Sequence, residues 1–453
     1  MGCRTAKRTP RWPTRLCQPV APARPRQTIL ATEAESSSSI EPPPRLNQSR
    51  VVRFMNARPT VFGYCTNIHA GLDRASIEAN LRQHSGVVRR QLGWDQLGIG
   101  LWIPQRAAHE IATDTKSFAK LLGELGLNPY TMNGFPFDNF HGDRVKHAVY
   151  QPAWWERARV DYTVQLAEIL AAILPDETQV GSISTLPLGW PSGDPATDQL
   201  RIEKSGEHLR EVAKCLRKIR RRTGKRITLA IEPEPGCLLD HSHDAVQFFQ
   251  QHLVGDTERE HLSICHDVCH AAVMMESQSD VLDAYRRAEI EVGKVQVSSG
   301  IAVHWDAMAS ARQHEALEQI RGFAEDRYLH QTGRRVADGS FALVEDLPDL
   351  LPKRVAANEP ATGDQLWTIH FHVPIFLDRI GNLSTTQSDI DEAFHVMHGD
   401  EAPSFTGHFE VETYAWTVLP ESMRRGSVND EIEKEMRWAI NRWERWTGAT
   451  KID

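Results

Sequence analysis

Ile264-Cys-His-Asp-Val-Cys-His270 is a short apolar run that passes directly into a carboxylate and an imidazole spaced Asp-x-x-His. About one helix earlier, Ile227-Thr-Leu-Ala-Ile-Glu-Pro-Glu234 is another apolar run that ends in carboxylates. Parallel strands of a barrel present the side chains at their carboxyl ends on one face. Carboxylate and imidazole ligands together suit a divalent metal ion. The two stretches therefore predict a barrel of parallel strands with a metal site at its C-terminal face.

The chain around these stretches alternates between apolar strand-like runs and amphipathic helices. Alternation of this kind favours a parallel sheet, and continuous apolar strands indicate that both faces are buried. We therefore predict an α/β fold, a (β/α)8 TIM barrel with insertions, over residues 56–450. The strand-like runs are 61–67, 97–103, 129–135, 180–186, 227–234, 262–265, 294–300, 366–374 and 407–416. The predicted helices are 76–90, 118–125, 157–174, 200–222, 245–253, 281–288, 308–326 and 429–446.

The prediction leaves two points open. The strand-like runs number one more than a barrel needs, so either residues 294–300 or residues 366–376 form an extra or edge strand. A doubly wound open sheet is the alternative fold. It is less favoured because no Gly-rich phosphate-binding fingerprint follows the first strand.

Residues 1–55 differ in composition from the rest of the chain. They are rich in Arg, Pro and Ser and poor in acids, so we expect a disordered N-terminal extension. Such a composition is typical of an organelle transit peptide, which would place the protein in a plastid or another organelle. The alternatives are a tail without an address, in a cytoplasmic protein, or a wrongly assigned start.

Composition excludes several classes of function. The net charge is −8, which gives no electrostatic footprint for nucleic acid, and no apolar run is long enough for stable membrane insertion. The seven cysteines show no disulfide-type clustering, so we expect reduced thiols. We expect a small molecule as the partner, and no oligomeric state is predicted.

Polar side chains gather at the predicted carboxyl ends of the strands. Glu232 and Glu234 lie two apart on an extended strand, so both can face the barrel mouth. These residues also have interpretations that involve no catalysis. In these, Glu232 is a buried hydrogen-bonded acid and the histidines are core residues. Cys265 and Cys269 are then packed thiols, or ligands of a structural zinc ion. The candidates at these ends are His69, Asn133, His141, Glu232, Glu234, His266, Asp267, His270, Gln296, His370, His372, Glu410 and Glu412.

Glu232, Asp267-x-x-His270 and Val411-Glu-Thr-Tyr414 resemble the motifs of xylose isomerase-like TIM barrels. That resemblance implies that Glu232, Asp267, His270 and Glu412 bind a divalent metal ion (Mn, Mg, Co, Zn or Fe). Gln296 stands where these barrels have a histidine, and His370 or His372 is the candidate replacement.

A more specific resemblance is to the EboE-type metabolite traffic proteins, and it spans roughly residues 60–447. It implies a role in the biosynthesis or export of a secondary metabolite, with partners from the same pathway. The motifs that carry it are 64–69, 133–136, 141–142, 181–190, 231–237, 265–270, 328–331, 370–374 and 410–416.

The two resemblances favour a metal-dependent isomerase or epimerase of a small sugar-like or phosphorylated metabolite. Glu232 and Glu412 would exchange the proton next to a carbonyl. The alternatives are a metabolite-binding escort barrel without catalysis, and a metal-dependent phosphodiesterase. Substrate contacts are expected from His69, Asn133, His141, Glu234, His266, Gln296, His370 and His372.

Overall fold

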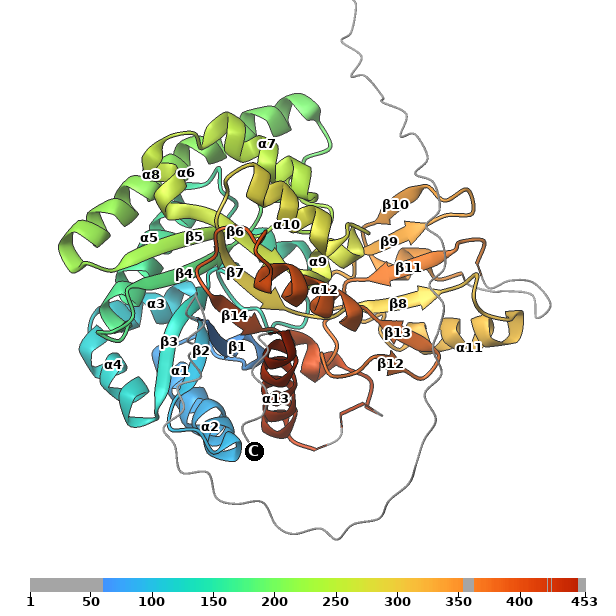
Figure 1. Ribbon diagram of the computed structural model, residues 1–453, viewed down its shortest axis with the longest axis horizontal. Coiled ribbons are helices and arrows are strands. Elements are labelled where there is room, and N and C mark those ends of the chain that lie inside the picture. The colour runs from blue at the N-terminus through green and yellow to red at the C-terminus, as the bar shows by residue number, and fades with distance from the viewer. Residues whose placement is uncertain (1–59, 353–361, 422, 425, 447–453) are drawn as a thin grey trace, which may run out of the picture. The chain divides into compact units, whose positions relative to one another are not determined.

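Eight parallel strands close into a barrel in the computed structural model, which describes residues 60–352, 362–421, 423–424 and 426–446. The barrel closes where the first strand pairs with the last, with Val61 opposite His408. The predicted (β/α)8 barrel is therefore confirmed (Figure 1). Its strands are β1 (Val61–Cys65), β2 (Leu97–Trp102), β3 (Leu127–Asn133), β4 (Val180–Thr185), β5 (Arg226–Ile231), β6 (Leu262–Asp267), β7 (Val292–Val297) and β14 (His408–Val411).

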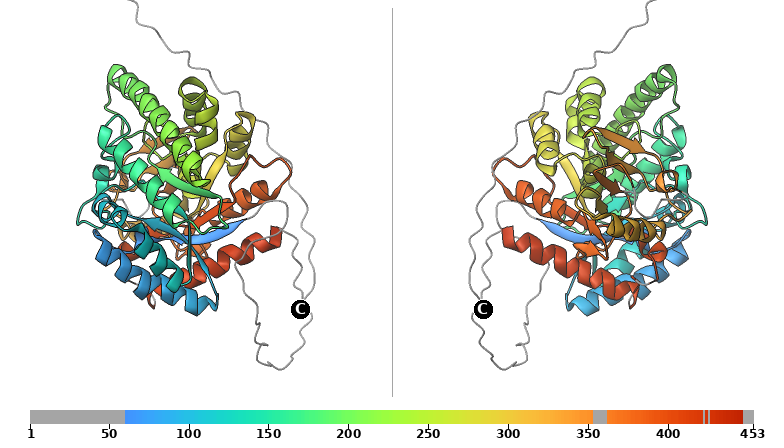
Figure 2. Two further views of the ribbon diagram at one scale, coloured as in Figure 1. Left: turned by 90° about the vertical axis from the view of Figure 1, so that its left-hand side faces the viewer. Right: turned by 90° about the vertical axis from the view of Figure 1, so that its right-hand side faces the viewer.

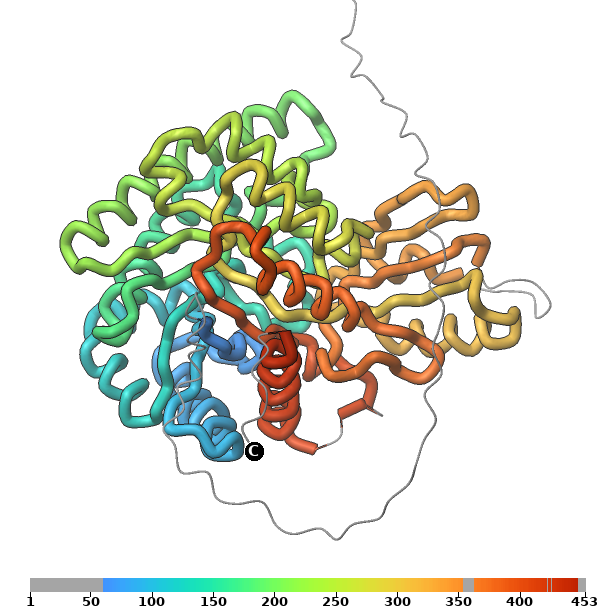
Figure 3. The backbone as a smooth tube through the Cα atoms, in the orientation of Figure 1, coloured from blue at the N-terminus to red at the C-terminus, as the bar shows by residue number. Residues whose placement is uncertain are grey.

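Helices connect successive strands and cover the outside of the barrel (Figures 2 and 3). The long helix α6 shows how the sequence sets their bounds: the Asp194 side chain caps its start, Pro195 is its first residue, and Gly224 ends it with a φ of 76°. The helices are α1 (Arg74–Asn80), α2 (Gly86–Leu92), α3 (Gln105–Ala112), α4 (Thr115–Glu124), α5 (Arg157–Ile173), α6 (Pro195–Thr223), α7 (Ser242–His252), α8 (Asp256–His261), α9 (Val268–Val273), α10 (Gln278–Arg287), α11 (Ser310–Arg321), α12 (Gln387–His398) and α13 (Val428–Trp446).

A second sheet is inserted between β7 and α12 and lies beside the barrel, at the right of Figure 1. Its strand order is β10-β9-β11-β8-β13-β12, and its pairs are antiparallel. The run at 366–374 contributes β11 to this sheet, so it is the extra strand and residues 294–300 supply barrel strand β7. The strands are β8 (Ile301–His304), β9 (Thr332–Arg335), β10 (Phe341–Val344), β11 (Leu366–Ile369), β12 (Arg379–Ile380) and β13 (Leu383–Thr385).

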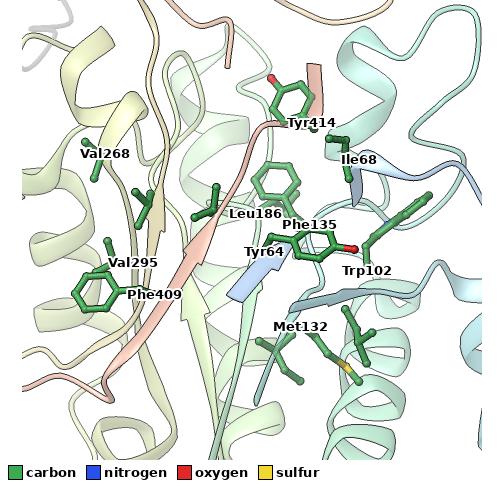
Figure 4. Packing of buried hydrophobic residues seen from close by; sticks show 14 of the residues in the cluster. Tyr64, Ile68, Trp102, Met132, Phe135, Leu186, Val268, Val295, Phe409 and Tyr414 are labelled. Atoms are coloured by element: carbon green, nitrogen blue, oxygen red, sulfur yellow. The ribbon is translucent and has the colours of Figure 1, made fainter. Parts of the chain in front are cut away.

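Side chains from the strands pack on both faces of the barrel wall. Apolar residues such as Met132, Val295 and Phe409 fill the layers between sheet and helices (Figure 4). An ion pair lies in the middle, where Lys294 Nζ is 2.5 Å from Glu410 Oε2 and both side chains are fully buried. Gly100 makes room for this pair, because a Cβ at that position would lie 1.3 Å from Glu410 Oε1.

Two further predictions concern the N-terminal extension and membrane insertion. The N-terminal extension, residues 1–55, lies outside the described residues, so its interpretation as a transit peptide stays a prediction. Within the described part of the chain, none of the helices has the length and apolar content that crossing a bilayer requires.

Candidate metal centre

The carboxyl ends of four neighbouring strands, β5, β6, β7 and β14, bring the main candidate residues together. Asp267 ends β6, its neighbour across the ladder is Gln296 on β7, and Gln296 in turn pairs with Glu410 on β14. Glu232 follows β5 directly, and its N–H donates to the Thr185 carbonyl at 2.9 Å. Parallel pairing in register therefore places side chains that are distant in sequence at one face of the barrel.

Asp267 is fixed by two hydrogen bonds on one carboxylate oxygen. Its Oδ1 accepts from the Ser298 hydroxyl at 2.7 Å and from the His270 N–H at 3.0 Å, which makes Asp267 the N-cap of α9. Burial would raise the pKa of Asp267, but His270 and these hydrogen bonds outweigh it and hold the pKa below its usual value. The carboxylate is thus ionised, and its other oxygen, Oδ2, is buried without a hydrogen-bond partner.

Glu232 and Gln296 form a second fixed pair. Gln296 Nε2 donates to Glu232 Oε1 at 2.7 Å. This bond leaves Glu232 Oε2 and Gln296 Oε1 buried and without partners. Burial raises the pKa of Glu232 to about 7, against the opposing effect of His270, whose Nδ1 lies 3.8 Å away.

Two histidines are held in the orientation that metal-binding imidazoles adopt. Nδ1 of His270 donates to the Pro233 carbonyl at 2.9 Å, and Nδ1 of His372 donates to the Glu412 carbonyl at 2.9 Å. A backbone bond to one ring nitrogen fixes the ring and frees the other nitrogen as a ligand. His372 Nε2 is buried without a partner and lies 4.0 Å from Asp267 Oδ2. Burial lowers the pKa of His372 to about 4, so the ring is neutral.

These residues fit a divalent cation. Buried polar atoms normally have partners, and the ones that lack them here are carboxylate, amide and imidazole atoms on adjoining side chains. The ligand atoms of Glu232, Asp267 and His270 lie within 4.8 Å of one another, and so do those of His270, His370 and His372. A mixed oxygen and nitrogen set suits Mn, Mg, Co, Zn or Fe. Among the buried atoms without partners in the described part of the chain are Glu232 Oε2, Asp267 Oδ2, Gln296 Oε1 and His372 Nε2.

Cys269 belongs to a further group of possible metal ligands. Its Sγ and the ligand atoms of Asp267 and His372 lie within 4.8 Å of one another. Burial, with Asp267 adding to it, raises the pKa of the Cys269 thiol well above its usual value. The thiol is therefore protonated and fills space behind the carboxylate. Cys265 is also buried and free, in line with the interpretation of both residues as packed thiols.

Glu412 takes a different position from the other predicted ligands. Its Oε1 accepts hydrogen bonds from Asn67 Nδ2 at 2.7 Å and from Asn133 Nδ2 at 2.9 Å. Among the described residues, none of the sets of close ligand atoms includes Glu412. Burial raises its pKa well above the usual value, and the neighbouring carboxylate of Glu232 adds to that effect. The hydrogen-bond partners of Glu412 thus differ from those of Glu232, although the sequence motifs group the two as ligands with the same role.

A cavity of about 530 Å3, including its open mouth, lies over these side chains. Its polar floor also contains Glu234, whose Oε1 accepts from the Tyr150 hydroxyl at 2.7 Å and from Gln331 Nε2 at 3.2 Å. His370 joins the same network, with Nδ1 donating to Gln331 Oε1 at 2.8 Å. The floor is formed by Asn67, Asn133, Glu232, Glu234, His270, His370, His372 and Glu412.

Four residues that we expected to contact substrate do not line this cavity: Gln296, which lies beside Glu232, and the histidines His266, His69 and His141. His266 precedes Asp267 on the strand and points to the opposite face, where its Nε2 bonds with Gln278 Oε1 at 2.8 Å. His69 follows a tight turn and stacks on His84, with 4.2 Å between ring centroids. His141 donates from Nε2 to the Asn67 carbonyl at 2.7 Å, so it supports a floor residue from behind.

Sequence reasoning does not single out several residues that complete the site. Asn67 is visible in the sequence only as a polar strand end, and its bond to Glu412 gives it a role. Tyr150 ends the short helix Lys146–Tyr150, Gln331 directly precedes β9 of the inserted sheet, and both hold Glu234. Tyr328-Leu-His-Gln331 is recognisable as a motif, but no spacing rule connects it to β5.

Comparisons with known proteins bear on the fold. No protein-family model matches the sequence, and no curated protein matches it. Similar solved structures include a xylose isomerase-like TIM barrel protein from Mycobacterium smegmatis in complex with magnesium, with 12% identity over 85% of this chain and 97% of that chain, and a TM-score of 0.47. A xylose isomerase domain protein from Alicyclobacillus acidocaldarius shares 11% identity over 86% of this chain and 100% of that one, with a TM-score of 0.43.

The IOLI protein with a zinc atom shares 11% identity over 85% of this chain and 98% of that chain, with a TM-score of 0.42. Two of these three structures hold magnesium or zinc, and all three have TM-scores below 0.5. The fold of this chain is established by its own closed ring of eight parallel strands.

Proposed function

We propose that the protein is a metal-dependent isomerase or epimerase of a small metabolite that carries a hydroxyl group next to a carbonyl. The observation that carries the proposal is the group of buried, unpartnered atoms of Glu232, Asp267, Gln296 and His372 beside the cavity. A cavity floor that combines metal-ligand atoms with a carboxyl group held by two amides suits proton transfer next to a polarised carbonyl.

The residues that would hold the metal ion are Glu232, Asp267, His270 and His372, with Gln296 as a neutral oxygen ligand. When bound, the ion supplies electrophilic polarisation of a substrate carbonyl. His372 takes the place in the ligand set that the sequence motifs assign to Glu412. This assignment follows from the proximity of its Nε2 to Asp267 Oδ2, at 4.0 Å.

Glu412 would act as the general base, ionised when the positive charge of a bound metal ion offsets the burial and the Glu232 carboxylate that raise its pKa. Two amide donors, Asn67 and Asn133, hold its Oε1, so the carboxylate is oriented while it lines the cavity. It would take the proton from the carbon next to the carbonyl and return it on the same face to the former carbonyl carbon, while the hydroxyl proton moves to the former carbonyl oxygen; this outcome is isomerisation. Epimerisation would instead need a second carboxyl group on the opposite face to return a proton to the same carbon, a role for which the sequence prediction offers Glu232. Asn67 and Asn133 would stabilise the carboxylate before and after transfer.

Proton exchange in deuterated water tests this proposal. The full chain, supplied with manganese, would be incubated with a panel of hydroxyketones, and deuterium uptake at the carbon next to the carbonyl would be followed by NMR. At least one compound should exchange, and Glu412→Gln should slow the exchange ~100-fold or more. The matched control is Glu431→Gln, a buried acid on α13 that pairs with Lys434 at 2.7 Å. Exchange in the Glu412→Gln protein at the unmodified rate would refute the assigned role.

The second candidate function is a metabolite-binding or escort barrel without turnover. Gln296, in the position where similar barrels have a histidine, favours it, because an amide is a weaker ligand than an imidazole. The two functions differ in one measurable property. An escort barrel would bind its metabolite in the presence of a chelator, whereas the proposed enzyme would lose proton exchange under that treatment.

The pathway is a further part of the proposal. The resemblance of the motifs to EboE-type metabolite traffic proteins supports a role in making or exporting a secondary metabolite, with partners from that pathway. Genetic deletion followed by metabolite profiling tests it. Accumulation of a carbonyl-bearing precursor would support the role, and an unchanged profile would contradict it.

A further inference from the structure

The cavity above the metal centre has two chemically different halves. Its floor presents carboxylates, amides and imidazoles. Its wall is formed by carbon-rich side chains from three separate segments of the chain. The main wall residues are Phe135, Phe140, Val149, Tyr328, Leu329 and Tyr414.

We propose that the substrate is an uncharged amphiphile, with a hydroxy-carbonyl head that reaches the floor and an aryl or branched alkyl group that lies against this wall. The inference rests on the proposed function, because the floor is taken as the reacting end. It narrows the substrate class and departs from the sugar-like or phosphorylated metabolite that the sequence suggested.

The cavity offers few groups that would bind a phosphate. Its floor holds the carboxyl groups of Glu232, Glu234 and Glu412, which give a phosphate no cationic partner. Lys146 is the single Lys or Arg among the described residues that line the cavity. Its Nζ is 2.5 Å from Asp346 Oδ2, and both side chains are largely buried, so its charge is already matched.

The aromatic wall presents carbon surfaces to the cavity. The rings of Phe140, Tyr328 and Tyr414 pack on one another, with centroids 5.0 to 5.2 Å apart. The Tyr328 hydroxyl donates to the Phe140 carbonyl at 3.1 Å, and the Tyr414 hydroxyl is 3.5 Å from His370 Nε2. With their hydroxyl groups engaged, the rings offer mainly apolar faces, which gain free energy when they bury an apolar group.

The wall also leaves room for the apolar group. A neighbouring hollow shares the apolar residues Pro136, Phe140, Val145 and Val149 with the cavity. A compact sugar would contact the floor and leave the apolar wall exposed to water. An aryl or alkyl group attached to the head would cover it.

Dye displacement on the full-length protein tests the inference. The uncharged dye N-phenylnaphthylamine, which fluoresces in apolar surroundings, should bind the cavity. Two competitors with the same hydroxyketone head would then be compared: α-hydroxyacetophenone, which has a phenyl group, and dihydroxyacetone phosphate. We expect the phenyl compound to displace the dye at a concentration ~10-fold or more below that of the phosphate. Absence of dye binding, or stronger displacement by the phosphate, would overturn the inference.

Variants locate the dye and separate the two proposals. Val149 is half-buried on the short helix at Lys146–Tyr150, and Val149→Asp should weaken dye binding ~10-fold or more. The control Val246→Asp changes a half-buried valine on α7 and should leave binding intact. If Val149→Asp fails to fold, Val149→Asn serves instead, and unchanged binding in the folded variant would refute the location.

Asp267→Ala distinguishes a failure of this inference from a failure of the proposed function. It should abolish metal binding and proton exchange but leave dye binding within twofold, roughly the scatter of such titrations. A wild-type protein that binds the dye selectively and yet shows no metal-dependent exchange would refute the enzyme and keep the amphiphile site. Exchange with dihydroxyacetone phosphate but not with the phenyl compound would refute the amphiphile site and keep the enzyme.

Discussion

Gln296 shares a hydrogen bond with Glu232, a residue of the cavity floor, with 2.7 Å between Nε2 and Oε1. The amide nitrogen of Gln296 is the donor in this bond, so its amide oxygen, Oε1, faces away from Glu232. The outer oxygens of both side chains are then buried and unpartnered. A glutamine in a histidine's place can therefore be an integral part of a metal site, because it orients one ligand and offers another.

Substitution of Gln296 tests this relationship. Gln296→Leu removes both the donor to Glu232 and the free oxygen, so we expect zinc affinity to fall ~10- to 100-fold. Gln296→His should raise it, because imidazole is the stronger zinc ligand. Competition with a chromophoric chelator measures both changes. Equal affinity in the Leu variant and the wild type would show that Gln296 takes no part in the site.

The buried pair of Lys294 and Glu410 gives a prediction about stability. Lys294→Met leaves the Glu410 carboxylate buried without its cation, which should cost ~3–5 kcal/mol of unfolding free energy. Changing both residues to Met removes the uncompensated charge, so the double variant should be more stable than Lys294→Met alone. Urea denaturation compares the three proteins. A double variant less stable than Lys294→Met would contradict the pairing.

Glu435 on α13 gives a prediction about pH. Its Oε1 accepts from the Thr413 hydroxyl at 2.6 Å and from the Ile375 N–H at 3.1 Å, and burial raises its pKa from 4.5 to about 7. The folded protein therefore holds a proton that the unfolded chain loses near pH 4.5. The contribution of Glu435 is full below that pH and is lost as the pH rises through 7.

Glu435→Gln keeps the acceptor and removes the titration. The wild type should lose ~3 kcal/mol of stability between roughly pH 4.5 and 8 that the Gln variant retains. Denaturant unfolding at several pH values measures the difference. Glu433→Gln, a substitution on the same helix of a residue that pairs with Arg437, is the control. Parallel pH profiles for wild type and Glu435→Gln would rule out the buried acid as their cause.

The barrel could be predicted from sequence because its strands are long apolar runs bounded by turn signals. Residues 180–186 and 227–234 show this, since burial on both faces imposes the pattern locally. The inserted sheet could not be predicted in the same way. Its strands have four residues or fewer, and β11 pairs with β8 across a long intervening segment, with Leu366 opposite His304. Such pairing leaves no local period to detect.

The candidate site could be predicted where strand position alone determines side-chain direction. Glu232, Asp267 and His270 lie together because they follow adjacent parallel strands. Sequence could not separate the roles of Glu232 and Glu412, because that difference arises from Asn67 and Asn133, two amides that reach Glu412 from other strands. For the same reason the side chain of His69 could not be placed, since it depends on the turn that follows β1.

The central claim is a divalent metal ion held by the carboxyl ends of the barrel strands. The most direct test is the metal content of the full-length protein, purified at neutral pH without chelator and measured by inductively coupled plasma mass spectrometry. The account predicts about one divalent ion per chain, and its loss in Asp267→Ala, with the control Asp391→Asn unchanged. A metal content near zero in the intact protein, which does not rise after incubation with manganese or zinc, would contradict it.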